Sequence, residues 1–305
     1  MKYLITGGNG FIGSNAVKAL LQLGHEVEVI DNLSSDAHDE FVFHEGAKYH
    51  KYHIEDYVMC SQVFEKFRPD YVLHFAALAR IQNCVDDPIL AYETNLIGTL
   101  NMLQLCVRNK VKKFVFSSTS AVYGLKNSPG EEAVPLNEDM VPDCLNAYSC
   151  SKLASEQACK MYTDLYGLPT ICLRYFNVYG PNQPKKGSYA PVIGIFSRQK
   201  KNKEPMTIVG DGLQTRDYVH VSDVVIANIL AATSDVYGEV FNVGSGKNYS
   251  VLELAKMMGG EYTYVPARAG EARHTLADIS KIREYLGWNP AMNLLNYMEN
   301  KIYDS

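Results

Sequence analysis

The chain has 305 residues, of which 47% are hydrophobic and 21% charged, a composition typical of a soluble protein with one large α/β domain or two modest ones. Its formal charge is −5 and its pI is about 5.9, so no overall basic field is present to attract nucleic acid or anionic lipid. No apolar stretch approaches the roughly 20 residues of a membrane span, and the N-terminus runs directly into a strand-like segment. We therefore expect a protein without a membrane span or signal peptide, acting on a small molecule.

Short apolar, β-branched segments recur along the chain with helical stretches between them. They read KYLIT, HEVEVID, PDYVLHFAA, KKFVFSS and LPTICLRYFNVYG. Each is nearly continuous and is bounded by polar residues or glycine, as expected for a strand that is buried on both faces. Because parallel strands need crossover connections, this alternation predicts an α/β fold with a parallel sheet wrapped by helices.

A glycine-rich turn follows the first of these strands. In TGGNGFIGSN, Gly7, Gly10 and Gly13 match a dinucleotide-binding spacing, and Gly8 supports the related G-x-G-x-x-G pattern. A strand precedes the turn and a helix follows it, so backbone N–H groups at the helix N-terminus are expected to bind a pyrophosphate. The alternative is a merely flexible turn. The interpretation predicts a Rossmann-type doubly wound parallel sheet.

The second strand ends at Asp31, which lies 31 − 7 = 24 residues after the first glycine of the motif. A carboxylate at about this distance accepts hydrogen bonds from the ribose hydroxyls of a bound dinucleotide and repels a 2′-phosphate. The sequence therefore predicts NAD, and not NADP, as the cofactor.

After Tyr179 the sequence changes to a loop rich in Pro, Gly and Lys, which predicts a domain boundary. We expect an NAD-binding domain over residues 1–178 plus a returning segment at about 219–243. A smaller α/β domain that binds the substrate is expected over residues 179–218 and 244–305.

The segment NAYSCSKLASEQ places Tyr148 and Lys152 four residues apart on a predicted helix, so both side chains share one face. An ammonium group beside a phenol favours the phenolate and makes it a usable general base. The alternative is an exposed helical pair. Upstream, Ser118, Thr119 and Ser120 end a predicted strand at the sheet edge where α/β proteins bind ligands, and of these we select Thr119.

Ten segments occur in an order that resembles the extended short-chain dehydrogenases/reductases. They include TGGNGFIGS, DNLSS, SSTSAVYG, YSCSK, LRYFNVYGPNQ and GDGLQTRDYVHVSDV. Over essentially the whole chain, the resemblance is closest to the nucleotide-sugar branch, that is, the UDP-glucose (UDP-galactose) 4-epimerases and their UDP-N-acetylglucosamine-accepting relatives.

The resemblance implies Tyr148 as catalytic base, Lys152 as the residue that binds the nicotinamide ribose and tunes that tyrosine, and Thr119 as a catalytic hydroxyl. The implied NAD-binding residues are Gly7, Gly10, Phe11, Ile12, Gly13, Asp31, Asn32, Ile54, Phe75, Ala76, Ala77, Asn95, Ser117, Tyr148, Lys152 and Tyr175. The implied substrate-binding residues are Thr119, Asn177, Val192, Arg216, Arg268, Glu271 and Thr275, with Arg273 nearby. Arg216 and Arg268 are expected on the diphosphate, since guanidinium groups pair bidentately with phosphate oxygens, although a surface ion pair is the alternative for each.

The implied reaction is epimerisation at C4 of a UDP-hexose through a 4-keto sugar, with transient hydride transfer to tightly bound NAD. The resemblance also implies a homodimer that associates through helices near residues 89–109 and 147–166. The seven cysteines contain no CxxC pair and are expected to be reduced thiols in a cytoplasmic protein, and we predict no metal site.

Several positions bear on the competing activities of relatives. Dehydratases and decarboxylases have acids where this chain has Ser120 and Ala121, and uronate-handling relatives tend to have Thr and Arg at the positions of Asn177 and Pro184. Thr275 stands where some epimerases have a bulky tyrosine, which leaves room for an N-acetyl group. The alternatives are another nucleotide-sugar enzyme, such as a UDP-glucuronate 4-epimerase or decarboxylase, a 4,6-dehydratase or a 4-keto reductase, and, more distantly, a non-catalytic NAD-binding protein.

Two positions depart from the family pattern. His53 replaces an aspartate that usually reaches the adenine amino group, and PVIG at residues 191–194 replaces a more usual AVIP. The first change affects the expected adenine contacts and the second the expected base selectivity.

Overall fold

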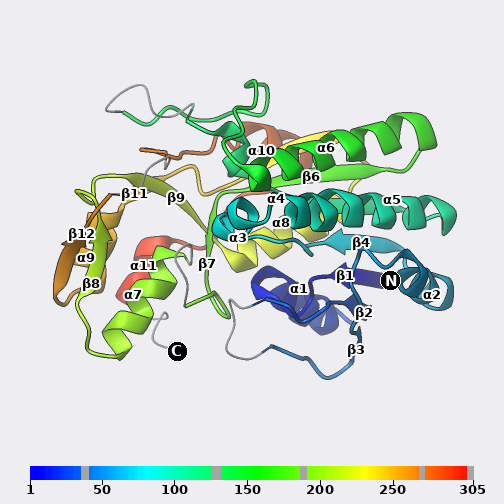
Figure 1. Ribbon diagram of the computed structural model, residues 1–305, viewed down its shortest axis with the longest axis horizontal. Helices are drawn as coiled ribbons and strands as arrows, with labels where there is room; N and C mark the ends of the chain where they lie inside the picture. Colours follow the sequence, from blue (N-terminus) through cyan, green and yellow to red (C-terminus); the bar gives the residue numbers. More distant parts are fainter. Residues whose placement is uncertain (36–40, 126–131, 186–190, 268–271, 301–305) are drawn as a thin grey trace.

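A seven-stranded, fully parallel sheet forms the centre of the molecule (Figure 1). The computed structural model of the chain describes residues 1–35, 41–125, 132–185, 191–267 and 272–300. The strand order is β10-β6-β5-β4-β1-β2-β3. The strands are β1 (Lys2–Thr6), β2 (Glu26–Ile30), β3 (Ala47–His50), β4 (Tyr71–His74), β5 (Lys113–Thr119), β6 (Thr170–Tyr175) and β10 (Glu239–Val243). The predicted Rossmann-type doubly wound sheet is confirmed.

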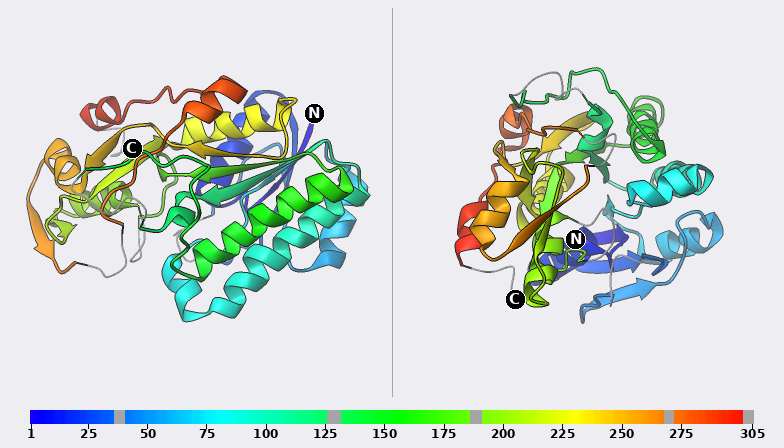
Figure 2. Two further views of the ribbon diagram at one scale, coloured as in Figure 1. Left: turned by 90° about the horizontal axis from the view of Figure 1, so that it is seen from above. Right: turned by 60° about the vertical axis from the view of Figure 1, so that its left-hand side comes forward.

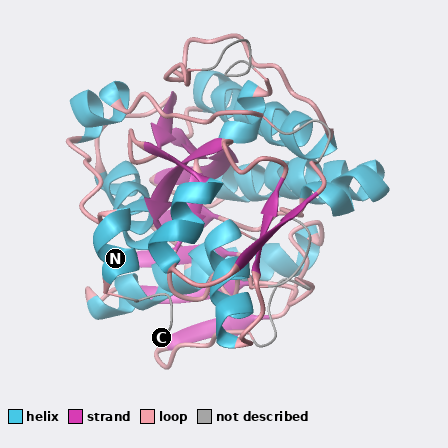
Figure 3. Cartoon of the chain, turned by 90° about the vertical axis from the view of Figure 1, so that its left-hand side faces the viewer, coloured by secondary structure: helices cyan, strands magenta, loops and turns pink. Residues whose placement is uncertain are grey.

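Helices cover both faces of this sheet (Figure 2 and Figure 3). One face packs against α1 (Phe11–Gln22), α8 (Val221–Thr233) and α10 (Ser280–Leu286), and the other against α2 (Tyr57–Phe67), α5 (Gly98–Arg108) and α6 (Ala147–Tyr166). Strand β1 shows why both faces are apolar, because Ile5 lies in the core under α1 and α8, whereas its neighbour Leu4 lies in the core under α2 and α5.

Short helical segments lie between β4 and β5 and directly after β5. The chain forms α3 (Ile81–Asp86), α4 (Pro88–Tyr92) and a π-helical segment, η1 (Glu93–Ile97), before α5, and a 3₁₀ segment, η2 (Ser120–Tyr123), follows β5. Asp87 is the N-cap of α4, and its carboxylate accepts a hydrogen bond from the Leu90 N–H.

Two smaller sheets lie beyond one end of the large sheet, to the left in Figure 1. One contains β7 (Asn177–Tyr179), β9 (Thr215–His220) and β11 (Asn248–Ser250), and the other β8 (Met206–Val209) and β12 (Tyr262–Val265). Helices α7 (Val192–Lys201), α9 (Val251–Met258) and α11 (Leu294–Glu299) pack with them around a separate apolar core.

We propose the two-domain division stated above, and its support is that residues 221–243 return to the large sheet as α8 and β10. The segment 279–288 differs from the expectation for residues 244–305. Helix α10 packs against β10, and the buried Trp288 donates its indole N–H to the Asp223 carbonyl at the start of α8. This segment therefore belongs with the core of the larger domain, because its apolar side chains cover the edge of that sheet.

Within the described residues, no helix combines the length and the apolar character needed to cross a bilayer. All seven cysteines are free thiols in the structure.

Candidate active site

The glycine turn between β1 and α1 is packed so tightly that side chains are excluded at two of its positions. A Cβ on Gly13 would lie 2.1 Å from the Gly7 carbonyl oxygen, and a Cβ on Gly7 would lie 2.7 Å from the Ala76 nitrogen. Helix α1 begins directly behind this turn, and its N-cap residue, Gly10, makes no side-chain cap. The backbone N–H groups of its first turn can therefore face an anion, so the turn fits the pyrophosphate of a dinucleotide.

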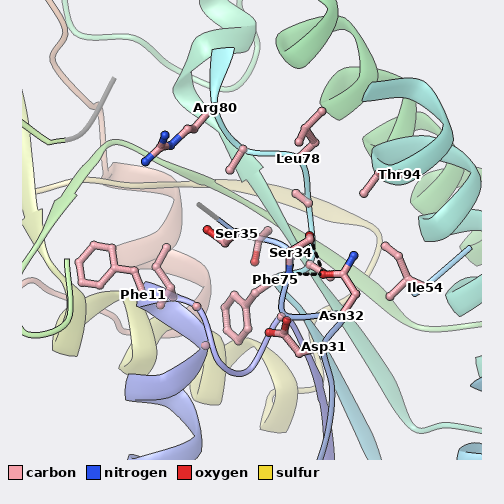
Figure 4. Close-up of a pocket in the computed structure, with 18 of the residues that line it drawn as sticks. Phe11, Asp31, Asn32, Ser34, Ser35, Ile54, Phe75, Leu78, Arg80 and Thr94 are labelled. Carbon is pink, nitrogen blue, oxygen red and sulfur yellow. Dashed lines mark hydrogen bonds between the residues drawn. The ribbon is translucent and has the colours of Figure 1, made fainter. Parts of the chain in front are cut away.

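The turn forms the floor of a cavity of about 490 Å³ at the carboxyl ends of β1, β2, β4 and β5 (Figure 4). All but one of the predicted cofactor-binding residues line it. These are Gly7, Gly10, Phe11, Ile12, Gly13, Asp31, Asn32, Ile54, Phe75, Ala76, Ala77, Ser117, Tyr148, Lys152 and Tyr175. The structure therefore brings together residues from seven segments of the chain in one pocket.

Asp31 sits at the end of β2 with both carboxylate oxygens oriented by the backbone. Its Oδ2 accepts a hydrogen bond from the Asn9 N–H at 2.9 Å, and its Oδ1 accepts one from the Leu33 N–H at 2.9 Å. Each oxygen has a further lone pair, so the carboxylate can still accept hydrogen bonds from ribose hydroxyls. Its position fits the role that the sequence predicts.

Tyr148 and Lys152 enter the cavity from the first turns of α6. The helix is fixed there by a capping box in which Asn146 and Ser149 hydrogen-bond each other's backbone. The Lys152 ammonium is buried and donates to the Ser117 carbonyl at 2.8 Å, and the Ser117 hydroxyl hydrogen-bonds the Tyr175 hydroxyl at 3.0 Å. The predicted pair is thus part of the cavity wall, not an exposed helical pair.

The pKa of Tyr148 differs from the expectation that a lysine would lower it. Burial raises the pKa of this phenol to about 12, while a hydrogen bond with the Thr119 side chain partly opposes the change. Burial also lowers the pKa of Lys152 to about 8. Desolvation is the largest cause of both pKa shifts, because burial disfavours the charged form of each side chain.

Two predicted residues lie near the cavity but do not line it. Thr119 hydrogen-bonds the Tyr148 side chain, and its hydroxyl oxygen also accepts a hydrogen bond from the Ala121 N–H. Asn95 is buried, and its side-chain amide binds both the N–H and the carbonyl of Leu78, a residue that lines the cavity. Ser118, which we did not select, lines the cavity and donates to Glu156.

Three of the predicted substrate-binding residues converge around β9. The Thr275 hydroxyl oxygen accepts hydrogen bonds from the Asn177 side-chain amide and from the Asp217 N–H, both at 3.2 Å. Arg216 is the neighbour of Asp217 on β9, and its guanidinium donates to the Thr215 carbonyl. Residues separated by up to 98 positions are therefore assembled into one cluster.

The remaining predicted substrate-binding residues are not joined to this cluster by the hydrogen bonds above. Val192 is the first residue of α7 and does not line the cavity. Arg268 and Glu271 lie outside the described residues. Arg273 forms a bidentate ion pair with Asp211, with both N–O distances 2.8 Å. For Arg273, the structure therefore shows the surface ion pair that was the alternative to phosphate binding.

The cavity also contains residues that sequence reasoning missed. Leu78 and Arg80 come from the loop after β4, Thr94 from η1, and Glu55 follows the predicted Ile54. Leu78 and Arg80 could have been found from the sequence, because they follow the carboxyl end of a predicted strand, where α/β proteins bind ligands. Glu55 and Thr94 gave no local signal, since they meet only in the fold.

The matching family model is described as the NAD dependent epimerase/dehydratase family and covers residues 3–244. The chain belongs to this family. Among solved structures, it is similar to UDP-glucose 4-epimerase with UDP-glucose from Thermotoga maritima, at 37% identity and a TM-score of 0.92, covering 100% of this chain and 98% of that one. UDP-glucose 4-epimerase complexed with NAD from Thermus thermophilus has 34% identity, a TM-score of 0.89 and coverage of 100% and 98%.

A third similar structure is the UDP-N-acetylglucosamine 4-epimerase from Methanobrevibacter ruminantium in complex with UDP-N-acetylmuramic acid. It shares 33% identity at a TM-score of 0.89, with coverage of 99% of this chain and 96% of that one. The resemblance stated from the sequence motifs is thereby confirmed. So are the predictions that this epimerase-family chain is an enzyme and that NAD is its cofactor.

Proposed function

We propose that this protein catalyses the NAD-dependent 4-epimerisation of a UDP-hexose, with UDP-glucose and UDP-galactose as one pair of substrates. The observation that carries the proposal is that Tyr148, Lys152 and the glycine turn line one cavity, with the Thr119 side chain hydrogen-bonded to the phenol. The similarity to enzymes named UDP-glucose 4-epimerase supports the choice of reaction.

We propose that the glycine turn holds the cofactor's pyrophosphate, Asp31 an adenosine ribose and Lys152 the nicotinamide ribose. When bound there, NAD would supply a hydride acceptor and a positive charge. The charge matters because the pKa of Tyr148 is about 12 in the protein environment alone, too high for a base at neutral pH.

In the proposed reaction, Tyr148 takes the proton of the sugar C4 hydroxyl and returns a proton to the C4 oxygen after the sugar has turned. NAD held at this site would accept the C4 hydride and give it back to the opposite face of C4, by way of a 4-keto sugar. Atoms and electrons balance over the cycle, so no coenzyme is consumed. Arg216 would hold the diphosphate of the nucleotide, because the sugar itself must stay free to rotate, and the Asn177–Thr275 pair would border the sugar.

We further propose that N-acetylated hexoses are accepted. Thr275 is a small residue, and its hydroxyl is already engaged by Asn177 and Asp217, so it offers space near the sugar without a competing polar group. A Thr275→Tyr substitution is expected to abolish turnover of UDP-GlcNAc while UDP-glucose is still converted. Loss of both activities, or retention of both, would argue against this assignment.

A homodimer is also proposed. Apolar side chains are exposed on the helices named above, with Ile89 on α4 71% exposed, Ile97 on η1 48% and Leu165 on α6 71%. Burying these side chains against a second copy would remove them from water. Light scattering of the wild type and of Leu165→Glu tests this, with a dimer expected for the first and a monomer for the second.

The test of the reaction is incubation with UDP-glucose, UDP-GlcNAc and UDP-glucuronate separately, with products identified by NMR and absorbance followed at 340 nm. Galacto-configured products without accumulated NADH are expected. Stoichiometric NADH, released CO₂ or a 4-keto-6-deoxy product would instead indicate one of the related activities. Tyr148→Phe should lower turnover by about 10²–10⁴-fold while the bound NAD is retained.

A further inference from the structure

The segment that follows β3 forms one end of the cavity, next to Asp31 and Asn32. Tyr52, His53, Ile54 and Glu55 all line it there. Figure 4 shows Ile54 and Thr94 on the same side of the pocket as Asn32. If a ribose binds at Asp31, as proposed above, the base attached to that ribose reaches this end. The base in NAD is adenine, which has flat apolar faces and a 6-amino group that only donates hydrogen bonds.

Glu55 has an acceptor atom here that receives no hydrogen bond from the described residues, since His53 Nδ1, 4.0 Å from Oε2, lies beyond hydrogen-bond distance. Its Oε1 accepts a hydrogen bond from the Thr94 hydroxyl at 2.5 Å, whereas its Oε2 is buried and has no hydrogen-bond partner among the described residues. The residue is held in place, because the Asn101 side chain donates to its carbonyl at 3.0 Å. A buried carboxylate oxygen without a donor is costly, and a ligand N–H would relieve that cost.

His53 cannot accept the same hydrogen bond. The side-chain oxygen of Asn32 accepts from the backbone N–H and the hydroxyl of Ser34, so the amide nitrogen faces His53 Nδ1 at 3.2 Å as a donor. The Nδ1 atom is then an acceptor already in use, and the other ring nitrogen carries the proton. His53 is therefore left with a donor only, and its ring is largely exposed, at 67%. A ring N–H of His53 and the adenine 6-amino group are both donors, so they cannot hydrogen-bond each other.

We propose that the Glu55 carboxylate accepts the adenine 6-amino N–H and makes this site selective for an adenine dinucleotide. A base with a 6-oxo group in the same place presents an acceptor to the carboxylate, and the two oxygens repel each other. The inference rests on the proposed cofactor placement and not on the identity of the sugar. Glu55 is a specificity-determining residue in this account, and it takes no part in hydride or proton transfer.

The test compares NAD with nicotinamide hypoxanthine dinucleotide, whose base has a 6-oxo group in place of the 6-amino group and a proton on N1. The full-length protein is dialysed to equilibrium against both dinucleotides in a known ratio, and the bound fractions are quantified by chromatography after acid release. The wild type is expected to prefer NAD by at least about tenfold. Glu55→Gln should reduce the preference to about threefold or less, because a glutamine amide can turn to present either an oxygen or an N–H.

His53→Ala is the matched control on the neighbouring exposed residue, and it should keep the wild-type preference. The proposal is overturned if Glu55→Gln keeps that preference, or if His53→Ala loses it. Asp31→Ala tests the placement separately and should weaken binding of both dinucleotides equally. If Asp31→Ala binds both as tightly as the wild type, the ribose does not lie at Asp31 and the placement itself fails. Thermal unfolding of each variant establishes that it is folded.

Discussion

Replacing Gly13 by alanine tests whether the cavity floor depends on the packing of the glycine turn. The added Cβ would lie 2.1 Å from the Gly7 carbonyl oxygen and 2.8 Å from the Gly8 Cα. Both neighbours are backbone atoms, so no side chain can rotate away and the turn itself must shift. Since Gly7 lines the cavity, that shift also moves the surface against which the cofactor binds.

The size of the effect follows from two opposing contributions. Overpacking of this kind costs about 1–3 kcal/mol, while alanine in a helix is favoured over glycine by up to about 1 kcal/mol, which leaves a loss of about 1–2 kcal/mol. An unfolding entropy of about 2.1 cal/mol/K per residue, over 305 residues, converts this loss into a fall in Tm of roughly 2–3 °C. The larger expected result is loss of cofactor, with bound NAD per chain falling below half of the wild-type value.

Gly10→Ala is the control within the same turn. A Cβ on Gly10 would lie 3.4 Å from the Gly7 carbonyl oxygen, close to an ordinary contact, and its φ of −78° suits alanine. Its Tm should stay within about 1 °C of the wild type, since it adds no overlap of this size. Calorimetry and NAD release from the three purified proteins make the comparison. If Gly13→Ala keeps the wild-type Tm and NAD content, the packing argument for this turn is refuted.

Two further predictions concern buried charges. Burial lowers the pKa of Lys152 to about 8. Because the unfolded chain, with a lysine pKa near 10.5, binds more protons, this group should make the unfolding free energy rise between about pH 8 and 10.5, by up to about 3 kcal/mol. Urea titrations should show this excess slope over Lys152→Met, and equal slopes would contradict it. Glu156→Gln leaves the buried Arg174 without its ion pair and should cost about 3–5 kcal/mol, whereas Asp211→Ala breaks an exposed pair with Arg273 and should cost less than about 1 kcal/mol. Equal shifts of the urea midpoint in these two variants would contradict the expected difference between the buried and the exposed ion pair.

Five of the strands that the sequence predicted share one property. Strands β1, β2, β4, β5 and β6 are inner strands of the large sheet and form short, nearly continuous apolar segments. Strand β3 escaped prediction because it lies at the sheet edge, and its sequence AKYH is polar and only partly buried. An edge strand is held by pairing with its neighbour, which the local sequence does not encode.

The predictable part of the site depends on local spacing. The glycine turn and the Tyr148–Lys152 pair were found because one turn or one helix fixes the geometry of each. The pKa of Tyr148 was not predictable, because it depends on burial by distant segments. Likewise, the contact between Glu55 and Thr94 joins residues 39 positions apart, and neither residue stands out in the sequence.

Asp217 shows how the site beyond local spacing is built. This buried residue on β9 donates its N–H to Thr275, and its carbonyl accepts from the Asn177 side chain. Its carboxylate accepts hydrogen bonds from the N–H groups of Ser245 and Gly246, which directly follow β10 of the large sheet. Asp217 thus connects the cluster proposed to hold the sugar nucleotide to the segment after β10. Strand β10 belongs to the large sheet, and the cofactor cavity lies at the carboxyl ends of other strands of that sheet. The proposed substrate cluster is therefore fixed relative to the cofactor cavity through the hydrogen bonds of Asp217. Asp217 need not touch either ligand, so its residue type and local spacing did not mark it in the sequence.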